Sequence, residues 1–204
     1  MNNTKKVGRP KKFNESQALQ AATEVFWSKG YDGASLKDLT EAMGINGPSL
    51  YATYGDKESL FLQSVTHYMA NSNCTPLEAF EQQTQIAVAV RSFFEAIIQY
   101  TTEHAGGTRG CFLSSCVSTC AETIAGVKPL LQHAIQESEN RLVTRFEQAK
   151  QAGELPQDFP SAQRARLMFD LRQGPVFRAR AGLSAPVIRA DIDYWVHMVL
   201  SSSQ

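Results

Sequence analysis

The chain contains 204 residues, of which 43% are hydrophobic, and this is enough apolar material to bury a sizeable core. Its 20 basic and 20 acidic residues cancel, yet residues 1–12 contain basic residues and no acidic one. A basic N-terminal segment on an otherwise near-neutral chain suggests that the N-terminal end of the protein binds a polyanionic partner. No apolar run approaches the ~18 residues of a membrane span, and no signal-peptide core follows Met1. We therefore expect a cytoplasmic protein without a membrane partner.

The cysteines and histidines form no metal or catalytic pattern. In a cytoplasmic chain, Cys74, Cys111, Cys116 and Cys120 are expected to be thiols. They include no C-x-x-C pair and the histidines are scattered, so we expect no metal site and no cofactor. The sequence also lacks a nucleophile–base pair and a phosphate-binding loop, and we expect that the protein is not an enzyme.

The chain after this basic segment predicts short helices with clear start and stop signals. Asn14 is a good N-cap for the first helix, which Gly30 ends. Ser35, with Asp38 three residues later, forms a capping box for a second helix. That second helix ends at Gly44.

Two further helices follow almost at once. Asn46 can cap a third helix, Pro48 is tolerated in its first turn, and Gly55 ends it. Asp56 then caps a fourth helix. Four capped helices within about 70 residues predict a compact unit.

The second and third helices, joined by "GIN", are typical of a helix-turn-helix. The alternative is an ordinary helical hairpin, which short helices often form. On a helical wheel, Leu50 and Tyr54 lie about 40° apart and can face the core together with Ile45. Pro48 and Ala52 lie on the opposite, small and polar face, as expected for a helix that enters a DNA major groove.

The rest of the sequence predicts longer helices. An amphipathic pattern begins at Ile86 and continues through Ile97, and "EHAGGTRG" interrupts it at 103–110. We expect helices at about 111–121, 129–153, 161–181 and from 184 onward. The sequence shows no convincing strand pattern and no internal repeat, so the predicted fold class is all-α.

The segments "GRPKKF" and "AATEVFWSKGYDGASLKDLTEAMGINGPSLYATYGDKESLF" resemble the TetR family of transcriptional regulators, and the likeness extends over residues 9–61. Farther along, "RGCFLSSC" is similar, more loosely, to a common ligand-sensing C-terminal type that includes thiol-responsive members. The resemblance implies a homodimer that binds an operator in double-stranded DNA. It also implies an N-terminal three-helix helix-turn-helix domain and a larger C-terminal helical domain for ligand binding and dimerisation. We expect a basic flexible arm at 1–12, a DNA-binding domain at 13–57 and the C-terminal domain at 58–204.

The resemblance implies that the protein is a ligand-responsive regulator. The expected form is a repressor that leaves its operator when an unknown small molecule binds the C-terminal pocket. The alternative is a thiol-based sensor of electrophiles or oxidants that acts through Cys111, Cys116 or Cys120. Cys111 is the first candidate because it matches the "GC" position of thiol-responsive members.

The DNA contacts follow from positions that match the family pattern. Ser35 would contact a phosphate, and the start of the third helix would face the bases. No Lys or Arg occurs between Lys37 and Lys57, so base reading must rest on polar hydrogen bonds, apolar contacts and DNA shape. The arm would supply charge and enter a minor groove. The predicted DNA-binding residues are Ser35, Lys37, Asn46, Gly47, Pro48, Ser49, Tyr51, Thr53 and Lys57, with Arg9, Lys11 and Lys12 in the arm.

A ligand pocket is expected between the inner faces of the central helices. Its predicted lining is Phe61, Val65, Tyr68, Phe94, Ile97, Tyr100, Phe112, Cys116, Met168, Leu171 and Arg172. If Arg172 faces inward it needs an anion or several acceptors, because an unpaired buried charge is costly; otherwise it points to solvent. Pro175 should either kink its helix, shaping the pocket or the dimer seam, or end that helix early.

The last two helices are expected to form the dimer interface. Ile188, Ile192, Trp195 and Val199 form a stripe that is too apolar for a free C-terminal helix. Val176 and Phe177 of the preceding helix would complete a four-helix bundle across a two-fold axis.

Overall fold

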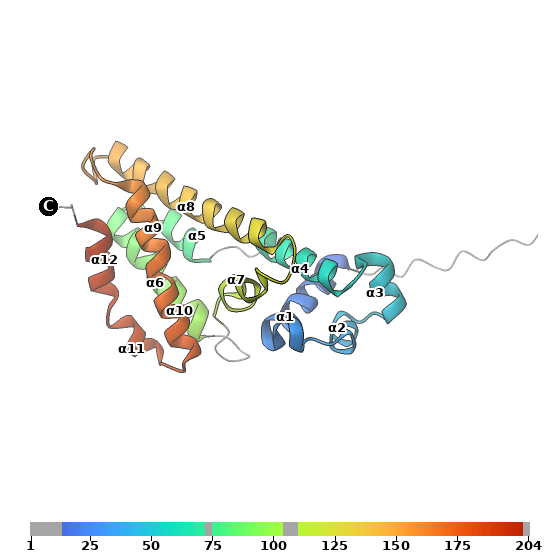
Figure 1. Ribbon diagram of the computed structural model, residues 1–204. Coiled ribbons are helices and arrows are strands. Elements are labelled where there is room, and N and C mark those ends of the chain that lie inside the picture. Colours follow the sequence, from blue (N-terminus) through green and yellow to red (C-terminus); the bar gives the residue numbers. More distant parts are fainter. Residues whose placement is uncertain (1–13, 72–74, 104–109, 202–204) are drawn as a thin grey trace, which may run out of the picture.

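The computed structural model describes residues 14–71, 75–103 and 110–201. Across these ranges the regular structure is helical throughout, without a strand, so the all-α prediction is confirmed. The molecule is elongated (Figure 1), with the helices of residues 15–71 at one end and those of residues 161–200 at the other. The long helix α8 (Val127–Gln151) runs beside both groups and contacts α4 (Lys57–Asn71).

The N-terminal helices begin where their capping residues predict, and the second and third also end at the predicted glycines. Their bounds are α1 Glu15–Gly33, α2 Leu36–Met43, α3 Gly47–Tyr54 and α4 Lys57–Asn71. The Asn14 side chain accepts a hydrogen bond from the Gln17 N–H at 3.2 Å, and the capping box of Ser35 and Asp38 is complete. At Gly30 the backbone leaves the helical region (φ 73°, ψ 168°), so the helical geometry of α1 is interrupted there.

The remaining helices form the larger part of the molecule. They are α5 Thr75–Glu81, α6 Ile86–Thr102, α7 Phe112–Ser115, α8 Val127–Gln151, α9 Ser161–Leu171, α10 Gln173–Arg180, α11 Ala185–Arg189 and α12 Ile192–Leu200. A 3₁₀ helix, η1 (Val117–Cys120), follows α7. The sequence did not reveal α5, which is only seven residues long.

Three predicted helices are divided in the structure. The helix expected at 111–121 is a single α-helical turn followed by η1. The helix expected at 161–181 consists of α9 and α10, and Pro175 lies in the first turn of α10, where proline is tolerated. The last predicted helix is divided into α11 and α12.

The buried side chains form two hydrophobic cores. One joins α1–α4 to α7, η1 and the start of α8, with Phe26, Phe61 and Phe112 fully buried in it. The other contains α5, α6, the C-terminal half of α8 and α9–α12. The core of the N-terminal helices thus extends beyond residue 57 and takes in a segment near residue 112. The domain boundary at 57/58 stays a prediction.

Within the described ranges, none of the helices has the combination of length and apolar content that crossing a bilayer requires.

Candidate functional site

The turn between α2 and α3 fixes the helix-turn-helix geometry. Gly44 has a left-handed backbone conformation (φ 65°, ψ 30°), which residues with a Cβ rarely adopt. This conformation lets the Ile45 N–H reach back to the Thr40 carbonyl at 3.1 Å. Asn46 then starts α3, its side-chain oxygen accepting a hydrogen bond from the Ser49 N–H at 2.9 Å.

The two faces of α3 separate as the helical wheel predicts. Leu50 and Tyr54 are buried in the N-terminal core, and Ile45 packs against it. The opposite face is open to solvent, and Tyr51 is 53% exposed. Of the other predicted base-facing and phosphate-facing residues, Asn46, Pro48, Ser49 and Thr53 are exposed and Gly47 is half-buried. This face therefore offers hydroxyl and amide groups without a formal charge.

The nearby charged groups are largely engaged within the protein. The Ser35 hydroxyl donates to the Asp38 carboxylate at 2.7 Å, and Lys29 Nζ lies 2.6 Å from the same carboxylate. The hydrogen bond from Lys29 is the largest of the effects that hold the pKa of the Asp38 carboxyl well below its usual range. In this arrangement the Ser35 hydroxyl donates its hydrogen bond to Asp38, and the phosphate contact expected of Ser35 stays a prediction.

The two predicted phosphate-binding lysines differ in their surroundings. Lys37 is exposed and lies 3.8 Å from Glu41 one turn along α2, a pairing that solvent weakens. Lys57 sits over the ring of Tyr31, with Nζ 4.5 Å from the ring centroid. The arm residues Arg9, Lys11 and Lys12 lie outside the described residues.

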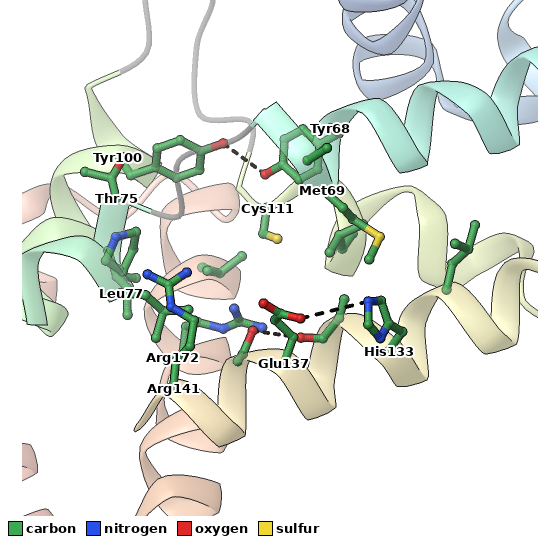
Figure 2. Close-up of a pocket in the computed structure, with 18 of the residues that line it drawn as sticks. Tyr68, Met69, Thr75, Leu77, Tyr100, Cys111, His133, Glu137, Arg141 and Arg172 are labelled. Atoms are coloured by element: carbon green, nitrogen blue, oxygen red, sulfur yellow. Dashed lines mark hydrogen bonds and ion pairs between the residues drawn. The ribbon is translucent and has the colours of Figure 1, made fainter. Parts of the chain in front are cut away.

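A cavity of about 530 Å³ lies between the C-terminal part of α4 and helices α5, α6, α8 and α10 (Figure 2). This volume is within the ~300–1,000 Å³ usual for small-molecule sites. Its lining residues are Thr66, Tyr68, Met69, Ala70, Thr75, Pro76, Leu77, Ile97, Tyr100, Thr101, Cys111, Leu113, Leu130, His133, Ala134, Glu137, Ser138, Arg141, Arg172 and Val176.

Only part of the predicted lining reaches this cavity. Tyr68, Ile97, Tyr100 and Arg172 line it. Six other predicted residues are buried in the two cores instead, namely Phe61, Val65, Phe94, Phe112, Cys116 and Met168. Leu171 packs, partly buried, against the C-terminal core. The prediction is therefore wrong for these seven, because helix periodicity identifies inward-facing residues but not which of them border empty space.

Sequence reasoning missed the contribution of α5 and α8. Leu77 of α5 and His133, Glu137 and Arg141 of α8 all line the cavity. The three polar residues of α8 are spaced four apart and so share a face of that helix, as Figure 2 shows. This spacing was the one signal in the sequence that could have assigned the three residues to the cavity. Because the same spacing is typical of a solvated helix face, it does not identify a cavity lining.

The polar groups of the cavity are partly paired with one another. The Tyr68 and Tyr100 hydroxyls lie 3.2 Å apart. Arg141 forms two hydrogen bonds of 2.6 Å to the Glu81 carboxylate, a bidentate pair. His133 and Glu137, both largely exposed on α8, lie 3.9 Å apart.

Arg172 differs from the other cationic group in the lining. Its guanidinium stacks on the Phe169 ring at 4.2 Å, and its Nε atom is buried without a hydrogen-bond partner. Among the residues the structure describes, none places a carboxylate oxygen within salt-bridge distance of Arg172.

The described cysteines are free thiols in unlike surroundings. Burial raises the pKa of Cys116 to about 11, and its Sγ donates to the Phe26 carbonyl at 3.2 Å. Burial also raises the pKa of Cys120. Both thiols stay protonated near neutral pH and are poor nucleophiles. Cys111 is half-buried and lines the cavity, whereas Cys74 lies outside the described residues.

Gly110 places Cys111 against α10. Its φ of 69° is left-handed, and a Cβ at this position would approach Val176 and Arg180 to 3.1 Å. The close contact with α10 and the left-handed backbone therefore explain why glycine precedes Cys111. The Cys111 thiol then lies beside the cavity.

The stripe predicted for the dimer interface faces the protomer's own core. Ile188, Ile192 and Val199 are at most 1% exposed, and the Trp195 ring packs against Phe94 with centroids 5.3 Å apart. These side chains are covered within one chain, so assigning them to the intersubunit surface is wrong. Val176 is buried as well and lines the cavity. Phe177, by contrast, is 73% exposed on α10.

Within the described part of the chain, His, Cys, Asp and Glu side chains do not gather in groups of three or more that could hold a metal ion.

Comparisons with known proteins agree with this architecture. The family model for bacterial regulatory proteins of the tetR family matches residues 18–63, and the model for the tetracyclin repressor-like C-terminal domain matches residues 88–191. The HTH-type transcriptional repressor ComR of Escherichia coli is 32% identical over 184 residues, which cover 88% of this chain and 86% of ComR.

Solved structures show the same fold. A cysteine mutant of the TetR family regulator CifR, complexed with double-strand operator DNA, is 28% identical with a TM-score of 0.81, over 93% of this chain and 98% of that one. Reduced E. coli NemR, at 13% identity, shares the fold with a TM-score of 0.78, over 93% of this chain and 99% of that one. The two family models and the extensive match to ComR show that the chain belongs to the TetR family of DNA-binding transcriptional regulators.

Proposed function

We propose that the protein is a ligand-responsive repressor, which binds its operator as a homodimer in the cytoplasm and leaves it when a small molecule fills the cavity. The observation that carries the proposal is the position of α4. In its first half, the Gln63 side chain donates to the Tyr54 carbonyl of α3 at 3.3 Å. At its other end, Tyr68 and Met69 line the cavity. One helix thus touches both the recognition helix and the expected effector site.

Release would follow from a shift of α4. A ligand that pushes against Tyr68 and Met69 would move α4, and α3 with it, in both protomers. The two recognition helices must stay about 34–36 Å apart to enter successive major grooves, so a small shift lowers operator affinity. The repressor named ComR and the CifR–operator complex support this assignment of the N-terminal helices.

DNA contact is proposed for the exposed face of α3, with Lys37, Lys57 and the arm residues Arg9, Lys11 and Lys12 supplying charge. The Tyr51→Phe variant tests the face without disturbing the core, because Tyr51 is exposed and the ring remains. Losing a hydroxyl that bonds a phosphate should lower operator affinity about 10-fold or more. A gel-shift titration with DNA from beside the gene measures this.

Thr144→Val is the control for Tyr51→Phe. Thr144 also carries a hydroxyl and is exposed, but it belongs to α8, away from the proposed DNA-binding and dimerisation faces, so the affinity of this variant for the operator should equal that of the wild type. Equal losses in both variants, or no loss in Tyr51→Phe, would count against α3 as the DNA-contacting face.

Dimerisation is proposed to use the exposed face of α10–α12 rather than the buried stripe. Phe177, Val187 and Tyr194 are large hydrophobic residues at least 50% exposed on these helices. Phe177→Asp should yield monomers by light scattering and should weaken operator binding, because a charge would enter an apolar interface. Val88→Asp, at another exposed position on α6, should remain dimeric. A dimeric Phe177→Asp protein would place the interface elsewhere.

A thiol-based sensor is the second candidate, and the position of Cys111 in the cavity lining favours it over the two buried cysteines. An electrophile that enters the cavity could alkylate this thiol and act as a covalent ligand. In a Cys74→Ser background, which leaves only the described cysteines, N-ethylmaleimide should modify Cys111 and spare Cys116 and Cys120. Peptide mass spectrometry identifies the modified residue.

The functional consequence is tested on the same proteins. If the thiol is the sensor, N-ethylmaleimide releases the operator from the Cys74→Ser protein but not from Cys74→Ser combined with Cys111→Ser. Release from both would rule out Cys111, and labelling of Cys111 without release would leave it a cavity residue only.

A further inference from the structure

We propose that the cavity binds an organic acid, an amphipathic monocarboxylate whose carboxylate pairs with Arg172. This inference rests on the proposed function, because it specifies the chemical class of the effector. It is carried by the one cavity-lining guanidinium, among the described residues, for which the protein itself supplies no carboxylate partner.

The other charges around the cavity are satisfied. Arg141 has the bidentate Glu81 carboxylate at 2.6 Å. Glu137 is largely exposed, so water solvates its carboxylate, and one of its oxygens lies 3.9 Å from His133 Nε2. Neither group therefore requires a charged ligand.

Arg172 has no such compensation. Its Nε is buried and lacks an acceptor, and its guanidinium plane is held against the Phe169 ring at 4.2 Å. Stacking of this kind orients the guanidinium but takes up none of its N–H donors. Removing a charged donor from water without a partner is costly, so an anion that accepts hydrogen bonds from Arg172 would bind with a gain that a neutral molecule lacks. A carboxylate matches the planar fork of the guanidinium in two parallel hydrogen bonds.

The rest of the cavity determines what the anion must carry. Apart from the polar groups named above, the walls are mainly aliphatic, with Leu77, Ile97 and Met69 on three different helices and Leu130 on a fourth. Burying apolar surface against these side chains stabilises a ligand with a hydrocarbon body. A small hydrophilic anion such as free phosphate would leave those walls uncovered. The complementary ligand therefore combines one carboxylate with an aliphatic or aryl-alkyl chain.

The test compares acids with their uncharged amides. Isothermal titration calorimetry of the full-length protein at pH 7.5 would use octanoate and 4-phenylbutyrate, each beside its primary amide. The wild type should bind the acids about 10-fold or more tightly than the amides. Arg172→Gln should weaken acid binding about 10- to 100-fold and remove the preference for acid over amide, while Arg172→Lys should retain part of it.

The variants also separate charge recognition from a structural role. If Arg172 only supports the fold through Phe169, Arg172→Gln would weaken acid and amide alike. Arg91→Gln, which removes a surface arginine paired with Asp193, should change neither affinity. The proposal is overturned if no acid binds the wild type, if acid and amide bind equally well, or if the preference for acid survives in Arg172→Gln.

A gel shift on the same ligands distinguishes this inference from the proposed function. Acids that bind through Arg172 without displacing operator DNA would support the inference and contradict ligand-induced release. Release of the operator by the amides, with acids bound no more tightly, would support release and overturn the role of Arg172.

Discussion

The packing of Phe112 between α1 and α4 is the contact on which the rest of the structure depends. Its ring is fully buried, with centroids 5.7 Å from Trp27 on α1 and 5.2 Å from Tyr68 on α4. The residues on either side of it, Cys111 and Leu113, line the cavity. A single segment therefore inserts into the core of the DNA-binding helices and forms one wall of the expected effector site.

This arrangement gives the two functions a common physical basis. The N-terminal helices share their core with the segment at 112–127, which contributes further buried apolar side chains to it. The same core contains Leu50 and Tyr54, which hold α3 in place. Any displacement of the cavity wall or of α4 therefore acts on packed side chains that lead to the recognition helix, and close-packed cores transmit such shifts.

Local signals allowed the N-terminal half to be predicted closely. Asn14, Ser35 with Asp38, Asn46 and Asp56 each cap the helix for which they were assigned, because capping depends on residues three positions apart. The division of α3 into a core face and an open face followed from its short, simple amphipathic pattern.

The C-terminal half depends on packing that no local pattern encodes. The stripe ending at Val199 was apolar, as predicted, but its partner is α6 of the same chain rather than a second subunit. The pocket was misassigned for a similar reason: Phe61 and Met168 face inward but are enclosed by other side chains. Arg172, by contrast, does line the cavity, although the sequence left open whether it faces inward or toward solvent.

Hydrogen–deuterium exchange of the Phe112→Ala variant tests whether α1, α4 and the segment at residue 112 share one core. Removing this ring should increase exchange in peptides covering α1 and α4, because the cavity it leaves weakens the packing of both. Phe159→Ala, which opens the C-terminal core instead, serves as the control and should leave α1 unchanged. If exchange in Phe112→Ala rises only between residues 110 and 127, while α1 and α4 remain as protected as in the wild type, the DNA-binding helices form a separate core that does not depend on Phe112.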